Sequence, residues 1–256
     1  MRIVVPIKPG SELDESDARA VEAALGVARR RIDVGVSVLT AGPADCLVGL
    51  RCALALGADE GVHVLDDELT TTDALALSRV LAAAIRRHGF DLVLCGAESE
   101  APNLSALPAM IAERLELPAL YDAEAVGSSA DGTEILALCD ATGGDCDPCD
   151  AYDPCDAGEL IERAAEPPVL VSVTERAAAP RYPAFPAVAE ARRKLVRTWT
   201  PATLGIDPAT VRRRGAPTAV SSTVLCARAH TIVTAGADPR GAATRLADFL
   251  DARRFL

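Results

Sequence analysis

Apolar runs alternate with helical patterns through the first half of the chain. Runs rich in Val, Ile and Leu predict strands at residues 2–7, 34–39, 61–65 and 91–95. Apolar residues at helical spacing then predict helices at about 17–31, up to 56, at 72–88 and at 104–115. This alternation predicts right-handed crossovers and an open, mostly parallel sheet with helices on both faces, a Rossmann-like α/β fold.

The second half of the chain is less regular. Leu120 to Val126 and Glu134 to Cys139 flank a turn-forming run and predict a hairpin added to the sheet, and Pro168 to Thr174 predicts a further strand. Ala187 to Val196 predicts a helix that carries a basic run. Arg240 to Leu256 predicts a short amphipathic helix after a Gly-rich lead, which suits a C-terminal arm.

These patterns predict two parts. Residues 1–225 form a nucleotide-binding-like α/β domain, with a Cys- and Asp-rich insert at about 139–156, and residues 226–256 form the C-terminal extension.

Composition narrows the classes of partner. The chain has 256 residues, of which half are hydrophobic, so it can bury a substantial core. Aromatic residues make up only 3%, which argues against a stacking surface for single-stranded nucleic acid. The 37 acidic residues outnumber the 26 basic ones, and the net charge of −11 repels phosphate backbones. We therefore expect no nucleic-acid partner.

The sequence shows no pattern typical of secretion or membrane insertion. No long apolar h-region with a cleavage site appears at the N-terminus, and no window approaches the roughly 18 apolar residues of a membrane span. Eight cysteines without a secretory signal indicate a reducing interior. We expect a cytoplasmic protein without membrane insertion.

Enzyme signatures are missing from the sequence. There is no P-loop, GxGxxG, GxSxG or HExxH motif, and the three histidines are His63, His88 and His230. His63 reads as a packed strand residue, and His88 lies near a helix C-terminus, where the dipole favours imidazolium. We predict no catalytic residue in this chain.

Loops at the ends of three predicted strands are better candidates for a site. In a sheet of order 3-2-1-4, the loops at Pro6 to Lys8, Thr40 to Pro43 and Gly96 to Ser105 converge where the order reverses, which suits a nucleotide. Backbone amides of a helix starting near Leu104 could hold a phosphate. The alternative is that these loops are ordinary strand–helix connections, and the spacing leaves both open.

Several segments together resemble the electron transfer flavoprotein beta subunits, including FixA-type members. They include VSVLTAGPADCLVGLRCALALGADEGVHV at 36–64 and DLVLCGAESEAPNLSALPAMIAERLELPAL at 91–120. LDESDARAVEAAL at 13–25, APRYPAFPAVAEARRK at 179–194, LGID at 204–207 and the C-terminal helix also fit. The resemblance covers most of the chain in the family's order, and a mycofactocin-associated member is one candidate.

The resemblance implies a role in electron transfer. Such beta subunits pair with an alpha subunit that holds most of an FAD, and shuttle electrons from partner flavin dehydrogenases to an acceptor. They bind AMP or a second FAD through the loops above, within 14–17 and 101–112. The implied cofactor-binding residues are Pro6, Asp14, Asp17, Ala41, Gly96, Glu98, Asn103, Leu104, Ser105 and Ala106.

The resemblance also implies a partner-docking segment at about 177–196. Its apolar anchor falls at Phe185 beside Pro186, because a large apolar side chain next to a proline suits an interface. Simple burial of Phe185 is the alternative.

Two departures from the family pattern alter these expectations. Ala101-Pro102-Asn103 and Leu107-Pro108 stand where the family has acidic residues and a Thr-Gly pair, and a proline has no N–H to donate. The loop between Lys8 and Leu13 is shorter than usual. We therefore predict weak or absent AMP binding.

The second departure is the insert CDATGGDCDPCDAYDPCD. Its thiols, Cys139, Cys146, Cys149 and Cys155, could ligate zinc or an iron–sulfur cluster. Against this, the spacing matches no standard signature and the six interleaved aspartates disfavour four thiolates, so a variable surface loop is the alternative. Cys46, Cys52, Cys95 and Cys226 lie in apolar patterns and are expected to be buried.

The leading hypothesis is an electron transfer flavoprotein beta subunit that frames the FAD of the alpha subunit and docks flavin dehydrogenases. One alternative is a stand-alone domain of the same fold that binds or senses adenine nucleotides. Another is a metal-binding redox protein that uses the cysteine insert.

Overall fold

The structure is a computed structural model that describes residues 1–69, 73–97, 104–140, 160–212 and 239–252. Its contacts divide the chain into two units, Met1–Ala219 and Val220–Leu256. Each unit is described by itself.

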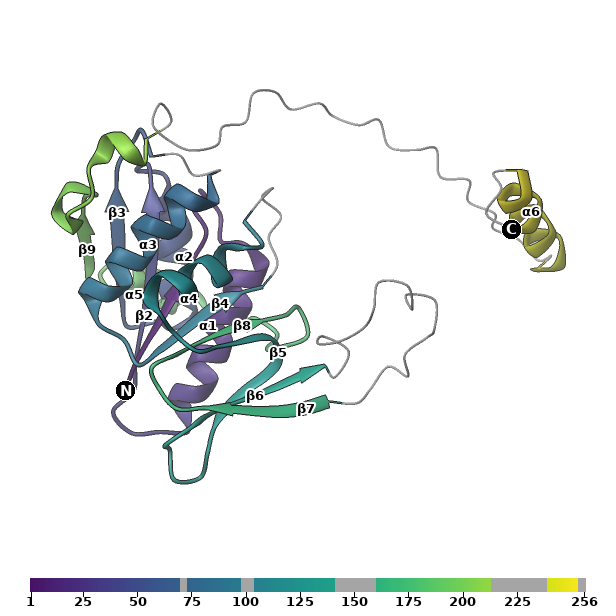
Figure 1. Cartoon of the computed structure of the whole chain (residues 1–256), viewed down its shortest axis with the longest axis horizontal. Coiled ribbons are helices and arrows are strands. Elements are labelled where there is room, and N and C mark those ends of the chain that lie inside the picture. Colours follow the sequence, from purple (N-terminus) through teal and green to yellow (C-terminus); the bar gives the residue numbers. More distant parts are fainter. Residues whose placement is uncertain (70–72, 98–103, 141–159, 213–238, 253–256) are drawn as a thin grey trace. The chain divides into compact units, whose positions relative to one another are not determined.

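The first unit is built on one sheet (Figure 1). In the described part of the chain it has nine strands in the order β7-β6-β5-β8-β4-β1-β2-β3-β9. The strands are β1 (Arg2–Pro6), β2 (Gly35–Gly42), β3 (Glu60–Leu65), β4 (Leu92–Gly96), β5 (Ala119–Ser128), β6 (Ile135–Asp140), β7 (Leu160–Ala165), β8 (Val169–Val173) and β9 (Val196–Trp199). Pairing is parallel from β5 to β9, and β6 and β7 add to β5 as antiparallel strands. The predicted fold class and the predicted order of the first four strands are confirmed.

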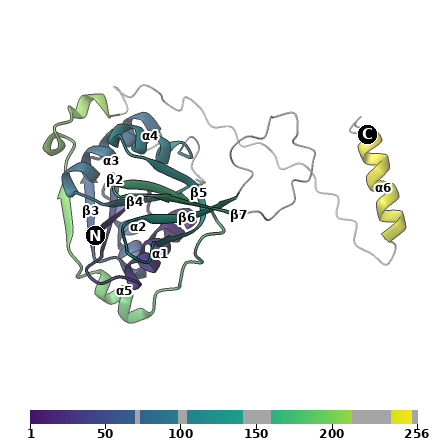
Figure 2. The same cartoon turned by 60° about the horizontal axis from the view of Figure 1, so that its bottom comes forward.

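Helices cover both faces of the parallel part of the sheet (Figure 2). They are α1 (Glu15–Arg29), α2 (Cys46–Leu56), α3 (Ala74–His88), α4 (Leu107–Leu115) and α5 (Phe185–Ala191). Two short 3₁₀ turns, η2 (Ala202–Leu204) and η3 (Pro208–Thr210), follow β9. Helices α1 and α2 pack in one apolar cluster and α3 and α4 in another, so the sheet separates two cores.

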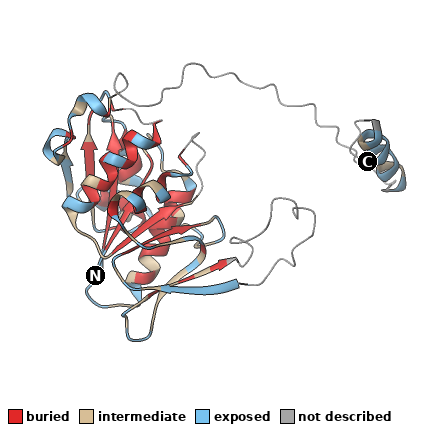
Figure 3. Ribbon diagram, viewed as in Figure 1, coloured by how far each residue is buried: buried red, intermediate tan, exposed pale blue. Residues whose placement is uncertain are grey.

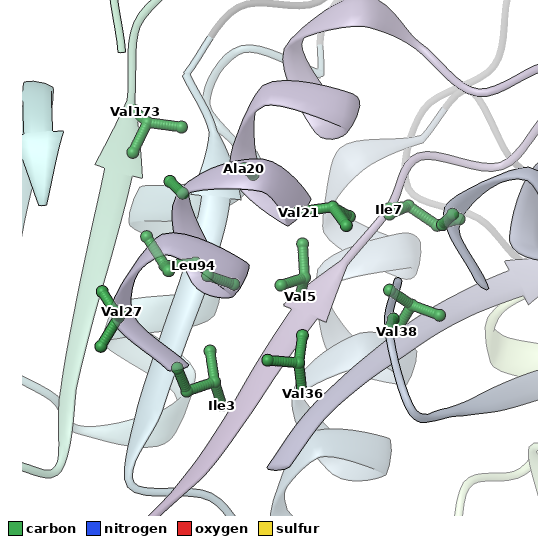
Figure 4. Packing of buried hydrophobic residues seen from close by; sticks show 14 of the residues in the cluster. Ile3, Val5, Ile7, Ala20, Val21, Val27, Val36, Val38, Leu94 and Val173 are labelled. Carbon is green, nitrogen blue, oxygen red and sulfur yellow. The ribbon is translucent and has the colours of Figure 1, made fainter. Parts of the chain in front are cut away.

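Alternation along each strand divides its side chains between the two cores. Ile3 and Val5 of β1 face α1 with Val21 and Val27, as Figure 4 shows, while Val4 joins the cluster under α3. The central strands are buried on both faces and read as continuous apolar runs, whereas most residues of β7 are exposed (Figure 3).

Helix ends follow local chemistry. The Asp14 carboxylate accepts a hydrogen bond from the Ser16 amide at the start of α1, and Asp73 does the same for Leu75 and Ala76 at the start of α3. Gly57 and Gly89 end α2 and α3 with φ of 137° and 81°, which side-chain-bearing residues rarely adopt. These residues limit each helix without help from distant contacts.

Some expected boundaries were wrong. Helix α4 begins at Leu107 instead of near Leu104, α5 ends at Ala191, and residues 196–199 form β9, which the sequence reading placed partly in a helix. Strand β7 was also missed. Both missed strands lie at the two edges of the sheet, where one side and much of the surface meet solvent, so they need no apolar alternation.

The described part of the second unit is helix α6 (Pro239–Ala252). Its Leu246 and Phe249 are exposed. The boundary expected near residue 225 stays a prediction, because residues 213–238 lie outside the described ranges. Within the described ranges, none of the helices has the length and apolar character that crossing a bilayer requires.

Candidate functional site

The carboxyl ends of β1, β2 and β4 meet at one edge of the sheet, which we call the strand-end edge. Strand β1 lies between β4 and β2, and the helices that follow β1 and β4 cover opposite faces. This is the point where the strand order reverses, and open α/β sheets bind ligands there. Pro6, Ala41 and Gly96 stand at or next to the ends of their strands, as expected.

A buried ionic network occupies this edge. The Lys8 ammonium lies 2.8 Å from the Asp17 carboxylate and 3.6 Å from Asp14, and it donates to the Ser16 hydroxyl at 2.6 Å. The Lys8 amide donates to the second Asp17 oxygen at 2.6 Å. Burial raises the pKa of the Asp17 carboxyl, and the Lys8 charge opposes that effect. Asp17 is therefore a structural ion-pair partner of Lys8, with both its oxygens engaged.

Close backbone contacts shape the same edge. A Cβ at Gly96 would lie 2.5 Å from the Ser16 hydroxyl oxygen and 2.7 Å from its carbonyl carbon, so β4 and α1 meet here at a distance only glycine allows. A Cβ at Gly49 would lie 2.9 Å from the Glu12 carbonyl oxygen, which brings the 10–12 loop onto α2. The structure thus brings Pro6, Asp14, Asp17 and Gly96 together.

The remaining predicted cofactor-binding residues differ in how far they are buried. Leu104 is buried in the core beneath α3, whereas Ser105 and Ala106 are exposed. Ala41 is buried within β2, beside Thr40, whose hydroxyl donates to the Ile7 carbonyl at 3.2 Å. Glu98 and Asn103 lie outside the described residues.

The first turn of α4 is a poor phosphate cradle. The Leu107 amide donates to the Leu104 carbonyl at 3.0 Å, and Pro108 has no N–H. Ala106 occupies the N-cap position of α4, and its side chain accepts no hydrogen bond from the amides of the first turn. Two of the amides that a phosphate at a helix start would use are therefore committed or missing.

The two histidines that the structure describes, His63 and His88, have packed surroundings, and His230 lies outside the described residues. His63 is buried and its Nε2 lies 3.1 Å from the Gly42 carbonyl, so Nε2 carries the hydrogen. Burial lowers the pKa of His63 and of His88. The expectation of a favoured imidazolium at His88 was wrong in this respect, because desolvation lowers its pKa even though the Glu60 carboxylate opposes that effect.

His88 lines a cavity at the other end of these strands, where the strands begin. The sequence did not indicate this cavity. The cavity has a volume of about 480 Å³ and lies where β1, β2, β3 and β9 begin. Its lining consists of Arg2, Gly35, Ser37, Asp59, Glu60, His88, Leu195 and Arg197. The Arg197 and Glu60 side chains pair at 3.1 Å, so much of its charge is internally balanced.

The cysteines divide into buried and exposed. Cys46 and Cys95 are buried, as expected, and burial raises the pKa of Cys46 to about 11 and that of Cys95 further. The expectation for Cys52 was wrong: it is exposed, because it lies on the outer side of α2. Cys226 lies outside the described residues.

The proposed metal ligands are mostly outside the described part. Cys139 is buried in β6, between β5 and β7, and burial raises the pKa of its thiol. Cys146, Cys149 and Cys155 lie outside the described residues. Among the residues that are described, no cluster of three metal-ligating side chains occurs. The four-cysteine ligand set stays a prediction.

The segment between β8 and β9 presents aromatic residues to solvent. Phe185 begins α5 and is 85% exposed, and Tyr182 is 98% exposed. Pro186 is exposed beside Phe185. The alternative of simple burial for Phe185 is therefore wrong, and its role as a docking anchor stays a prediction.

Comparisons with known proteins agree with the fold and extend it. The family profile described as "Electron transfer flavoprotein domain" matches residues 3–204. The electron transfer flavoprotein subunit beta of Mycobacterium tuberculosis (strain ATCC 25618 / H37Rv) is 33% identical over 229 residues, which cover 88% of this chain and 78% of the relative. The proteins of the same description from Thermoanaerobacterium thermosaccharolyticum and Clostridium acetobutylicum are 28% identical (83% and 75% covered) and 29% identical (82% and 74% covered).

Proposed function

We propose that this chain, which belongs to the electron transfer flavoprotein family, is the beta subunit of a heterodimer. It frames the FAD held mainly by an alpha subunit, and docks partner flavin dehydrogenases whose electrons pass to an acceptor. The flavin supplies the electron-carrying chemistry, and this chain supplies position and recognition.

The observation that carries the docking part is the exposure of Phe185. Fully burying a phenylalanine side chain is worth roughly 1.5–3 kcal/mol, so an aromatic residue left in solvent at a helix start fits an unfilled protein contact. The electron transfer flavoprotein profile spans this segment, which supports a redox protein as the partner that fills the contact.

The residues at the strand-end edge fit a frame better than a phosphate site. The Lys8 ammonium is already held by Asp17 and Ser16, so it offers little to a phosphate, and two carboxylates stand beside it. The first turn of α4 lacks free amides at Leu107 and Pro108. We therefore propose that the chain orders its own loops here and holds AMP weakly or not at all.

Co-expression with an alpha subunit tests the proposal. The expected result is a yellow complex with about one FAD per heterodimer, much less than one AMP after denaturation, and flavin reduction by a flavin dehydrogenase. One AMP per heterodimer would refute the weak-binding statement alone. A chain that purifies alone, binds adenine nucleotide and takes no alpha subunit would replace the proposal with the stand-alone nucleotide sensor.

Metal analysis of anaerobically purified complex addresses the third reading. Less than about a tenth of an equivalent of iron or zinc per chain would remove the metal-binding redox protein, because a Cys-ligated site retains its ion through purification.

A further inference from the structure

The segment from Ala177 to Leu195 is tied to the body of the domain at both of its ends. Residues 178–184 form neither helix nor strand, and α5 has only Ala191 buried among its seven residues. A segment with so little apolar burial needs other contacts to hold one position. Two sets of polar contacts supply them.

The first set is a clamp on α1. Arg181 binds Glu22 through two nitrogens, Nε at 2.8 Å and Nη2 on the other carboxylate oxygen. Arg29 approaches the same carboxylate at 2.6 Å. The Glu22 side chain is only 10% exposed. A bidentate guanidinium–carboxylate pair fixes orientation as well as distance, so Glu22 holds the chain one residue before Tyr182.

The second set is a pair of reciprocal helix caps. Arg51 of α2 donates to the carbonyls of Ala191 and Lys194 at 2.7 and 2.8 Å, at the end of α5. Lys194 in turn donates to the carbonyls of Leu54 and Ala58 at 3.1 and 2.7 Å, at the end of α2. Arg51 thus meets the C-terminal end of α5, and Lys194, which follows α5 in the chain, meets the C-terminal end of α2, so both helix ends are stabilised.

Between these two sets stand Tyr182 and Phe185, three residues apart and almost fully exposed. The chain has only eight Phe, Tyr and Trp residues, and two of them are almost fully exposed in this one segment. Exposure of two such residues together favours a contact surface. Holding both in place before binding lowers the conformational entropy that docking costs.

Charge around the aromatic pair has the sign opposite to that of the whole chain. Arg192 and Arg193 are exposed just after α5 and outnumber the exposed Glu190, whereas Arg181 is already paired with Glu22; the net charge of the whole chain is −11. Such a local reversal suits a partner whose contact surface is acidic.

We propose that Glu22 is a positioning residue that presents Tyr182 and Phe185 as a two-point anchor. The partner is a protein with an apolar pocket rimmed by carboxylates. The inference rests on the proposed docking function and deepens it, because it assigns the order of the segment to α1 and adds Tyr182 to the contact.

The first measurement is hydrogen exchange of the 178–191 backbone in the full heterodimer, with no partner present. Glu22→Gln weakens the clamp and keeps the shape of the side chain, and we expect exchange there to accelerate about tenfold or more. Glu124→Gln is the matched control. It weakens a neighbouring Arg–Glu pair, the single contact of Arg176 with Glu124 at 2.9 Å, five residues before Arg181, and should leave the segment unchanged.

The second measurement is the kinetics of flavin reduction. Flavin dehydrogenases from the source organism are first compared, and the one that reduces the wild-type heterodimer fastest serves as the electron donor. We expect Glu22→Gln, Tyr182→Ala and Phe185→Ala each to raise KM for this donor about tenfold, with kcat and the rate of reduction by dithionite unchanged. The Glu22→Gln effect should largely vanish in the Phe185→Ala, Tyr182→Ala background, since the clamp acts through those side chains.

The outcomes separate cleanly. Unchanged exchange in Glu22→Gln overturns the clamp whatever the heterodimer reduces. Faster exchange with an unchanged KM overturns the positioning role, and an unchanged KM in Tyr182→Ala overturns the second anchor. A wild-type heterodimer that no flavin dehydrogenase reduces would refute the docking function and with it the anchor, while the exchange measurement still decides whether Glu22 orders the segment.

Discussion

Helix α1 holds two carboxylates that bind basic residues from other elements, and they behave differently. Asp17 and Lys8 are enclosed, with side chains 2% and 6% exposed, at the end of the sheet where the strand order reverses. Glu22 is also buried, but its partner Arg181 is 45% exposed. Enclosed pairs are costly to break because the remaining charge stays buried, whereas a partly exposed partner can turn to water. The first pair therefore holds the fold, and the second holds a surface segment.

Removal of Lys8 should give the largest effect on stability. Lys8→Met leaves Asp17 buried without its counter-ion, and we expect a loss of about 3–5 kcal/mol in the free energy of unfolding. The double variant Lys8→Met, Asp17→Leu should recover part of this loss, because the uncompensated charge at Asp17 is gone although the residue-8 amide loses its acceptor. Urea denaturation of the complex measures both, and equal losses in the single and double variants would contradict the comparison.

Gly96→Ala tests the close contact beside the enclosed pair. The new methyl would lie 2.5 Å from the Ser16 hydroxyl oxygen and 2.7 Å from backbone, so β4 and α1 must separate, at a cost of about 1–3 kcal/mol. Gly127→Ala is the control, since no atom lies within 4 Å of its Cβ position, and a change within about 0.5 kcal/mol is expected there. The two melting temperatures should differ by several degrees; overlap would remove the contact from the account.

Lys194→Ala removes the cap that the docking segment gives to α2. It loses two charge-assisted hydrogen bonds, to the carbonyls of Leu54 and Ala58, so we expect a loss of about 2 kcal/mol. Arg193→Ala, one residue earlier and exposed, should change stability by less than about 0.5 kcal/mol. Denaturation curves that rank Arg193→Ala as the more harmful change would show that the caps do not tie the segment to α2.

Acid should weaken the domain through its buried histidines. Burial lowers the pKa of His63 below its ordinary value, so the unfolded chain takes up a proton that the folded chain refuses. This stability is fully present above about pH 6.5 and is lost as the pH falls below it. His63→Gln keeps a donor for the Gly42 carbonyl and should show a smaller fall between about pH 7.5 and pH 5.5. Parallel falls in the two proteins would assign the acid sensitivity elsewhere.

Phe185→Ala should have the smallest effect on stability. The side chain is 85% exposed, so its loss should change the free energy of unfolding by less than about 0.5 kcal/mol. Calorimetry of the heterodimer measures this. A loss above 1.5 kcal/mol would mean that Phe185 packs within the complex, and that its effect on docking kinetics is indirect.

Local patterns were enough for the first four strand–helix units. Each strand is a short apolar run that stops at a polar or glycine residue, and Gly57 and Gly89 end two helices through their own backbone freedom. The usual order of a doubly wound sheet brings the ends of the first, second and fourth strands together, so Pro6, Ala41 and Gly96 could be placed near one another in advance. Asp14 and Asp17 were placed there by the family resemblance alone.

The site itself was less predictable. The sequence shows a lysine after an apolar strand and aspartates three positions apart at a helix start, which is a usable signal, yet it does not say that Lys8 is already paired. The exposure of Cys52 depends on which side of α2 faces the sheet. The cavity around His88 joins residues from five elements, and no local motif marks it.

The sequence by itself determined the α/β class, because hydrophobic period and turn residues act within a few positions. The order of the first four strands followed from the usual doubly wound arrangement, and the family followed from the resemblance of several long segments. The tertiary structure alone decided the edge strands β7 and β9, the capture of Lys8 by Asp17, and the clamp between Glu22 and Arg181. Those two clamp residues are 159 positions apart, and they pair only because the folded sheet brings α1 next to the segment that follows β8. A pattern of neighbours carries no information about such a contact until the fold has closed.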